Sequence, residues 1–352
     1  MLPIREQWSL KDWKPIPSSL LQTPLCGLLG CKFPILLAGM GGVSRHELAA
    51  AVANAGGYVM LGMVREDPAL IAREIGLLQQ ATTKSFAVNI IPSATEPKLL
   101  DMQIDTCVEL GVKAFTLFWD IVPSAVARVK EHGCLVLHQV GTTLAAQEAQ
   151  DCGVDVIIAQ GLEAGGHIHG RTGLLSLVSD VVSKTRLPVV ASGGIATGAG
   201  IAAALAAGAQ GVQCGTAFLA TTESFAHDYH KQRIVVAGAD STVLTDIYVL
   251  NWPAHAAVRV LENSVTRALG HNLLGHDPER LERKVIAHEA ERPLFLYSTD
   301  SPLRNTYGNL EAMPIYAGQG APAITAVISA AERLHQLVSE AENCLNRLTL
   351  EH

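Results

Sequence analysis

Residues 187–220, LPVVASGGIATGAGIAAALAAGAQGVQCGTAFLA, decide the fold class of this chain. The apolar run LPVVAS is followed by two glycines, an alanine-rich stretch and a second apolar run, GVQC. A run that is hydrophobic throughout, rather than at alternate positions, is typical of a strand buried on both faces of a parallel sheet. The stretch therefore predicts a strand, a crossover helix and a second parallel strand.

The same unit repeats upstream of this stretch. Apolar runs alternate with amphipathic segments that carry helix signals, such as Asp67-Pro68 before ALIAREIGLLQQ and Gly56 after HELAAAVANA. Eight strand-helix units within about 190 residues favour a closed (β/α)8 TIM barrel, with an open flavodoxin-like or Rossmann sheet as the alternative. The predicted strands are 34–39, 57–63, 85–91, 112–119, 134–141, 154–161, 187–194 and 211–220.

Three regions are expected along the chain. Residues 1–221 form the barrel core with an amino-terminal extension. Residues 222–312 are richer in His, Arg and Glu and lack strand runs, so they predict a helical lid or insertion over the barrel mouth. Residues 313–352 predict a loop and a terminal helix that packs back on the barrel.

Composition limits the class of function. Hydrophobic residues make up 49% of the chain and charged residues 17%, so a large core is expected. The net charge of −7 argues against nucleic-acid or anionic-membrane partners, which select basic surfaces. The first residues lack the apolar core of a signal peptide, and the seven cysteines show no paired metal spacing. These features predict a cytoplasmic protein with reduced thiols.

Two glycine loops predict a phosphate site. In such barrels the active site forms at the carboxyl ends of the strands, and the loops after strands seven and eight often bind phosphate through backbone N–H groups. Ser192-Gly193-Gly194 and Gly215-Thr216 occupy these two positions. The alternative is that the glycines only tighten the turns. The G-x-G-x-x-A match at 198–203 lies inside a helix start and is interpreted as chance rather than as a dinucleotide fingerprint.

The loop QGLEAGGHIHG (160–170) presents the strongest candidate for acid–base chemistry. His167 titrates near neutral pH, and Gly165 and Gly166 beside it leave room for a flat ligand. An exposed histidine without a task is the alternative. His167 and His169 could form a metal pair, but no third ligand is evident, so no metal is expected. His138 closes an apolar strand and is equally consistent with a structural or a functional role.

Six segments resemble the nitronate monooxygenase (2-nitropropane dioxygenase) family of FMN-dependent TIM barrels, over about Thr23 to Ala321. They are PILLAGMGGVS, FAVNII, GVDVIIAQGLEAGGH, LPVVASGGIATG, GVQCGTAF and YAGQG. The resemblance implies electron transfer from an alkyl nitronate to FMN and then reaction with O2, giving a carbonyl compound and nitrite. FMN-dependent enoyl-ACP reductases and NAD(P)H:quinone reductases share the motifs, so an NAD(P)H-dependent reductase is the main alternative. A barrel that binds without turnover and an unrelated phosphate-binding isomerase are the others.

The resemblance also assigns site residues. It makes His167 the active-site acid/base or anion stabiliser, and it places His138 and Gln139 near the substrate or the flavin. It implies a small-molecule substrate and O2 as partners, with a homodimer left open. Gly39 stands where relatives carry proline, which is expected to loosen that turn, and His138-Gln139 stand where some relatives carry lysine. The residues implied at the flavin are Gly39, Met40, Asn89, Gln160, Gly165, Gly166, Ser192, Gly193, Gly194, Gly215, Thr216 and Gln319.

Overall fold

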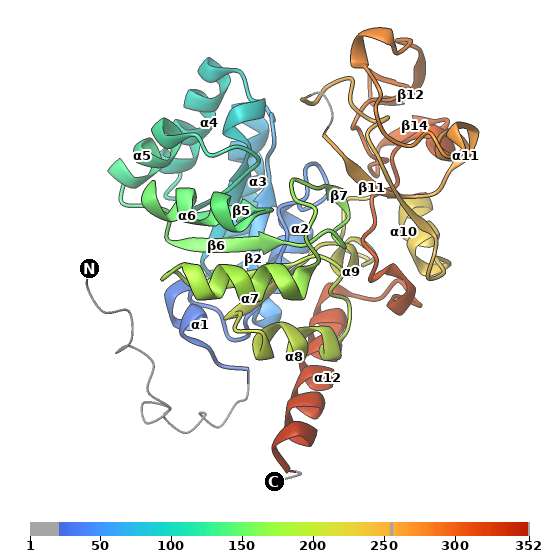
Figure 1. Cartoon of the computed structure of the whole chain (residues 1–352). Coiled ribbons are helices and arrows are strands. Elements are labelled where there is room, and N and C mark those ends of the chain that lie inside the picture. Colours follow the sequence, from blue (N-terminus) through green and yellow to red (C-terminus); the bar gives the residue numbers. More distant parts are fainter. Residues whose placement is uncertain (1–20, 254–255, 351–352) are drawn as a thin grey trace.

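The structure is a computed structural model that describes residues 21–253 and 256–350. Its core is a closed barrel of eight parallel strands, as predicted (Figure 1). All eight predicted apolar runs contain a barrel strand. The strands, in their order around the barrel, are β1 (Ile35–Leu37), β2 (Tyr58–Gly62), β3 (Phe86–Ile90), β4 (Ala114–Phe118), β5 (Leu135–Val140), β6 (Val156–Gln160), β8 (Val189–Ser192) and β9 (Gly211–Cys214).

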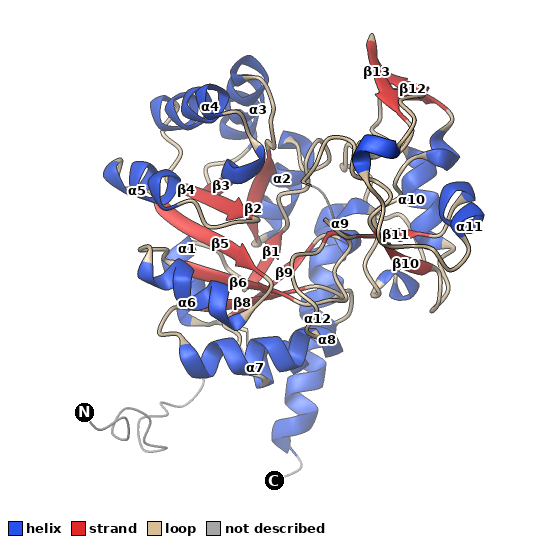
Figure 2. Ribbon diagram, turned by 45° about the horizontal axis from the view of Figure 1, so that its top comes forward, coloured by secondary structure: helices blue, strands red, loops and turns tan. Residues whose placement is uncertain are grey.

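Helices cover the outside of the barrel (Figure 2). Asp67 caps α3 as predicted, because its carboxylate accepts a hydrogen bond from the Ala69 N–H and Pro68 occupies the first turn. The outer helices are α2 (His46–Ala55), α3 (Pro68–Ala81), α4 (Pro97–Glu109), α5 (Pro123–Glu131), α6 (Thr143–Asp151), α7 (Leu174–Lys184), α8 (Gly198–Ala206) and the short α9 (Thr216–Leu219).

The two ends of the barrel differ. At the amino ends of the strands, α1 (Pro24–Leu29) packs Leu25 and Leu29 against inward side chains such as Leu36 and Tyr58. The terminal helix α12 (Ala330–Leu350) follows the predicted loop and packs against α8 and α2 (Figure 1). The carboxyl ends of the strands are therefore the end left for a site. Short 3-10 turns occupy Pro92–Ala94, Pro278–Arg280, Leu310–Ala312 and Ala321–Ala323.

The prediction of a helical, strand-free segment at 222–312 is wrong. The region contains two helices, but most of its regular structure is β, in two three-stranded antiparallel sheets beside the barrel mouth (Figure 2). These strands are short and only partly buried, so they lack the continuous apolar run by which a central parallel strand is found. The elements are α10 (Asp228–Val235), β10 (Thr242–Thr245), β11 (Val258–Leu261), α11 (Ser264–Leu269), β12 (Val285–Glu289), β13 (Arg292–Phe295) and β14 (Thr306–Gly308).

One strand of these sheets comes from the barrel loop that carries the candidate histidine. Gly166–His167 form the two-residue strand β7, which pairs with β11 in the sheet β10-β11-β7. His167 lies opposite Val258 and Gly166 opposite Arg259. The added segment therefore fixes the backbone of the EAGGH loop by sheet pairing.

The seven cysteines are free thiols, and Cys26, Cys107, Cys134 and Cys214 are buried. None of the helices among the described residues is both long enough and apolar enough to cross a membrane.

Candidate active site

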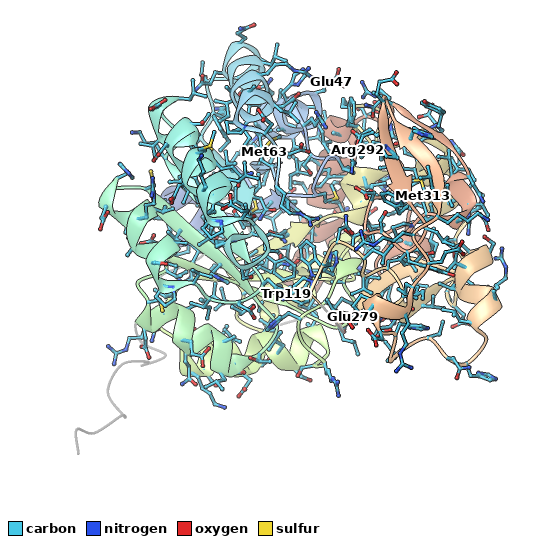
Figure 3. All side chains as sticks on the ribbon, turned by 90° about the horizontal axis from the view of Figure 1, so that it is seen from above. Glu47, Met63, Trp119, Glu279, Arg292 and Met313 are labelled. Atoms are coloured by element: carbon cyan, nitrogen blue, oxygen red, sulfur yellow. The ribbon has the colours of Figure 1, made fainter. Side chains whose placement is uncertain are left out.

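A cavity of about 750 Å³ lies at the carboxyl ends of the barrel strands. The barrel loops form one side, and the segment that contains Trp252 and Arg292 forms the other (Figure 3). Figure 3 shows Met63 and Trp119 on the barrel side, facing Arg292 across the mouth. The predicted site residues that line this cavity are Gly39, Met40, Asn89, Gln139, Gln160, Gly165, Gly166, His167, Ser192, Gly193, Gly194, Gly215 and Thr216.

Polar side chains form the floor of the cavity. Because side chains alternate along a strand, apolar residues deeper in the barrel give way to one inward polar residue per strand near the carboxyl end. Gln213 Nε2 donates hydrogen bonds to Gln139 Oε1 at 2.7 Å and to Ser192 Oγ at 3.1 Å. Asn89 Nδ2 donates to the Thr116 carbonyl at 3.0 Å. Thr116 and Gln213 were not predicted, although each interrupts an apolar run in the sequence.

Several polar atoms of the cavity have no hydrogen-bond partner within the described part of the chain. Such buried atoms are costly to leave unsatisfied, and in native proteins a ligand or water usually pairs with them. They include both donors and acceptors, so a ligand that satisfies them presents both kinds of group. The unpaired atoms are Thr116 Oγ1, Gln160 Oε1, His167 Nε2, Gln213 Oε1 and Trp252 Nε1.

The glycine loop after β8 has the backbone geometry of an anion cradle. Gly193 has φ 120° and Gly194 has φ 68°, both in the region that favours glycine. A Cβ on Gly194 would lie 2.9 Å from the Glu163 Cβ, so the loops approach each other closely. Over the described residues, the N–H groups of Gly193, Gly194 and Thr216 donate to no other group. Since Thr216 also begins α9, these N–H groups converge where a phosphate is favoured.

The terminal segment closes this side of the cavity through glycine contacts. A Cβ on Gly320 would lie 2.4 Å from the Gly194 carbonyl oxygen, and one on Gly165 would lie 2.5 Å from the Gly318 nitrogen. Gly318 N–H donates to Thr216 Oγ1 at 3.0 Å. Gln319, predicted at the flavin, is exposed and lies outside the cavity lining, while its neighbours Gly318 and Gly320 line it. The prediction for the Gln319 side chain is therefore wrong, because the close backbone packing turns it outward.

Gly39 is held in a close contact rather than in a loosened turn. Ser44 Oγ accepts a hydrogen bond from Met40 N–H at 3.2 Å and donates one to the Ala38 carbonyl at 2.7 Å. A Cβ on Gly39 would lie 2.3 Å from the Asn89 Cβ. The expectation that glycine loosens this turn is wrong, because the missing side chain is the space into which Asn89 packs.

We expect Gly39→Ala to lower the free energy of unfolding by about 1–3 kcal/mol, the usual cost of overpacking a buried site. The added methyl group displaces Asn89 from the cavity floor, and the urea midpoint measures the loss. Gly76→Ala is the matched control, since nothing lies within 4 Å of its Cβ position in α3. It should stabilise the protein by about 0.5–1 kcal/mol, as alanine does in a helix interior. Equal midpoints for the two variants would contradict the close contact.

His167 lies inside the cavity as a neutral imidazole. Its carbonyl accepts a hydrogen bond from Gln160 Nε2 at 2.9 Å, and its ring stacks on Trp252 at 3.8 Å between centroids. Burial, together with the nearby positive charge of Arg65, lowers the pKa of His167 to about 3. The ring is therefore uncharged at neutral pH, and its unpaired Nε2 can exchange a hydrogen bond or a proton with a ligand.

Aromatic rings surround His167. Trp119, at the end of β4, lies 6.0 Å from the His167 ring and 5.7 Å from the Trp252 ring. Its φ of 77° is unusual for a bulky residue and marks a strained position of the kind found at functional sites. Tyr316 lies 6.1 Å from His167 and donates a hydrogen bond to the Thr299 carbonyl. Tyr316 begins the YAGQG motif, but neither it nor Trp252 was predicted at the site.

His138 lies outside the cavity. It alternates with Gln139 on β5, so Gln139 faces the barrel interior and His138 faces the helices. Burial lowers its pKa to about 4, and its Nδ1 bonds the Gln139 carbonyl at 3.1 Å. The prediction that His138 is close to substrate or flavin is therefore wrong. His169 pairs with Asp120 at 3.6 Å, and no group suited to hold a metal ion occurs among the described residues.

Comparisons with known proteins agree on one family. The family model described as nitronate monooxygenase matches residues 22–340. The nitronate monooxygenase of Paraburkholderia phytofirmans is 32% identical, over 92% of this chain and 96% of its own. A (3aS,4S,5R,7aS)-5-hydroxy-7a-methyl-1-oxo-octahydro-1H-indene-4-carboxyl-CoA dehydrogenase of Mycobacterium tuberculosis is 37% identical, over 64% of this chain and 63% of its own.

Two solved structures are similar over nearly the whole chain. FabK from Thermotoga maritima has a TM-score of 0.80 and 30% identity, covering 94% of this chain and 99% of its own. The nitroalkane oxidase from Streptomyces ansochromogenes has a TM-score of 0.75 and 30% identity, covering 92% of this chain and 99% of its own.

Proposed function

This chain belongs to the nitronate monooxygenase family, and on that premise we propose that it oxidises alkyl nitronates with O2 to a carbonyl compound and nitrite, using FMN. It is an oxidoreductase, and the family implies a flavin. The observation that carries the proposal is the neutral His167 in an aromatic cavity whose other side is a glycine cradle. The relative named a nitronate monooxygenase and the solved nitroalkane oxidase act on the same class of substrate.

The cavity has the groups that FMN needs. The free N–H groups of Gly193, Gly194 and Thr216 would hold the phosphate. A flavin ring edge presents both carbonyl acceptors and an N–H donor, which match the unpaired donors and acceptors of the floor, Gln160 among them. When bound, FMN accepts two electrons from the substrate and delivers them to O2. FMN rather than a dinucleotide is proposed because no second phosphate cradle has been identified at this site.

His167 would act on the nitro group or on the carbon beside it. Its neutral Nε2 would donate a hydrogen bond to a nitronate oxygen, or accept the α-proton when the substrate is a neutral nitroalkane. Stacking on Trp252 holds the ring in one plane, and the backbone pairing of β7 with β11 holds its position. The aromatic wall excludes water from this contact, which strengthens any hydrogen bond that forms.

We expect kcat/KM for a preformed nitronate to show no ionisation of His167 between about pH 6 and 8.5. A group whose pKa is lowered to about 3 is neutral throughout this window and becomes charged only as the pH falls through that value. An ordinary histidine would instead show a step near 6.5. Steady-state rates at constant ionic strength test this, and a step near 6.5 that vanishes in His167→Gln would contradict a neutral His167.

Anaerobic mixing of the yellow holoenzyme with propyl-1-nitronate tests the reaction itself. We expect the nitronate to reduce the flavin and so decrease its visible absorbance, and air to restore it with release of nitrite. NADH and NADPH mixed in parallel should leave the absorbance unchanged. A purified protein that neither contains nor binds a flavin would overturn the proposed cofactor.

An NAD(P)H-dependent reductase acting on quinones or enoyl thioesters is the second candidate. The 37% identity to a carboxyl-CoA dehydrogenase over the barrel favours it, since that relative acts on a CoA thioester. Reduction of the flavin by a nicotinamide and not by the nitronate would establish this candidate in place of the first.

We also propose that the protein works in the cytoplasm. Its seven cysteines are free thiols, which are typical of a reducing compartment.

A further inference from the structure

Arg65 occupies a strained position at the cavity mouth. It follows β2 and lines the cavity. Its φ of 56° lies in the left-handed region, which costs a non-glycine residue of order 1–3 kcal/mol and persists only where the surrounding structure enforces it. The unusual backbone at Arg65 is therefore a feature that the fold maintains.

The contacts of Arg65 join it to the wall around His167. Its Nη1 donates a hydrogen bond to the Asn251 carbonyl, and its guanidinium carbon lies 5.4 Å from the Trp252 ring centroid. Trp252 in turn stacks on His167. Arg65 and His167 are thus close enough that the charge of Arg65 acts on the imidazole. A substrate that reaches His167 therefore enters the field of Arg65.

The charge of Arg65 is not neutralised by a direct ion pair. Across the described residues no carboxylate oxygen lies within 4.0 Å of its nitrogens, and Asp300, which acts on it from farther away, is bound by Arg292 at 3.0 Å. Arg45, another arginine of the cavity, pairs with Glu74 at 3.7 Å. Burial lowers the pKa of Arg65, but guanidinium stays charged at neutral pH. A partly buried cation without an anion is costly, so a ligand anion would be stabilised beside it.

We propose that Arg65 is a specificity-determining residue that binds a planar oxyanion of the substrate. The group is the nitronate itself or a carboxylate elsewhere on the molecule, because the flat guanidinium fork matches both. This assignment rests on the proposed function for the substrate class and on the unpaired charge for the residue. It explains why the anionic form of the substrate is selected in a cavity whose histidine is uncharged.

The test uses the flavin-loaded enzyme and nitrate, a planar anion that the enzyme does not oxidise. Nitrate binding is followed as a shift of the flavin visible spectrum, which requires no turnover. We expect Arg65→Asn to raise the Kd of nitrate about 10- to 100-fold, the usual loss for a hydrogen bond to a charged group. Asparagine is chosen because it tolerates a positive φ. Arg65→Lys restores the charge and should bind nitrate more tightly than Arg65→Asn.

Arg280→Asn is the matched control. Its side chain is 86% exposed, pairs with Asp277 and lies outside the cavity lining, so the Kd of nitrate should not change. Two substrates then distinguish the two sources of the anion. If Arg65 binds the nitronate group, Arg65→Asn weakens propyl-1-nitronate and a carboxylated nitronate by the same factor in anaerobic flavin reduction. If it binds a carboxylate, only the carboxylated nitronate is weakened.

Two results would overturn the assignment. One is a folded, flavin-loaded Arg65→Asn enzyme whose Kd for nitrate changes by less than about 2-fold. The other is a wild-type enzyme that does not bind nitrate at all. Neither depends on turnover, so an enzyme that fails to oxidise nitronates but binds nitrate through Arg65 would refute the proposed function and retain the anion site.

Discussion

A His167→Asn enzyme should keep its flavin and lose turnover of nitronate by at least ~100-fold, the usual scale for a positioned acid–base group. The flavin should remain because the glycine cradle and the polar floor come from other strands. The loss should fall on kcat, since the unpaired Nε2 faces the position of the reacting group rather than a remote binding contact. Steady-state kinetics and the ratio of visible to protein absorbance give both quantities from one preparation.

His167→Gln separates the two roles proposed for this residue. Glutamine offers a hydrogen bond but is not a base, so it should recover part of the rate with a preformed nitronate and none with the neutral nitroalkane. Recovery with neither substrate would assign proton transfer or packing against Trp252 as the main role. A His167→Asn enzyme that turns over at the wild-type rate would remove His167 from the mechanism.

Gly194→Asp should empty the cofactor site. A carboxylate about 4 Å from the phosphate costs about 4 kcal/mol near a protein surface, which is more than ~100-fold in Kd. Flavin content after purification, and the Kd measured by adding FMN to the apoprotein, should both show this loss. The fold should survive, because aspartate tolerates the left-handed φ of 68° better than most residues.

Gly194→Asn is the matched control for this variant. Asparagine has the same shape, tolerates the same backbone and meets the same contact with Glu163, but it carries no charge. It should therefore hold much more flavin than Gly194→Asp. Equal flavin content in the two variants would show that the Glu163 contact, and not charge, decides occupancy, and would refute the placement of the phosphate.

The barrel was predictable because its strands are buried on both faces. Burial makes each run hydrophobic throughout, and eight such runs at regular spacing favour closure. The glycine loops were predictable for a related reason, since a loop at the carboxyl end of a strand faces the site wherever the strand lies. Gly193 and Gly194 accordingly line the cavity with positive φ values.

The sequence by itself thus determined the barrel, the end at which the site lies and most of the loops that form it. Only the tertiary structure decided which face of each strand turns inward, and so separated Gln139 from His138. It also brought Trp252 and Tyr316 to His167 and left Arg65 without an ion-pair partner. The physical reason is range: burial of a strand is written in adjacent residues, whereas contacts between distant segments depend on how the whole chain packs.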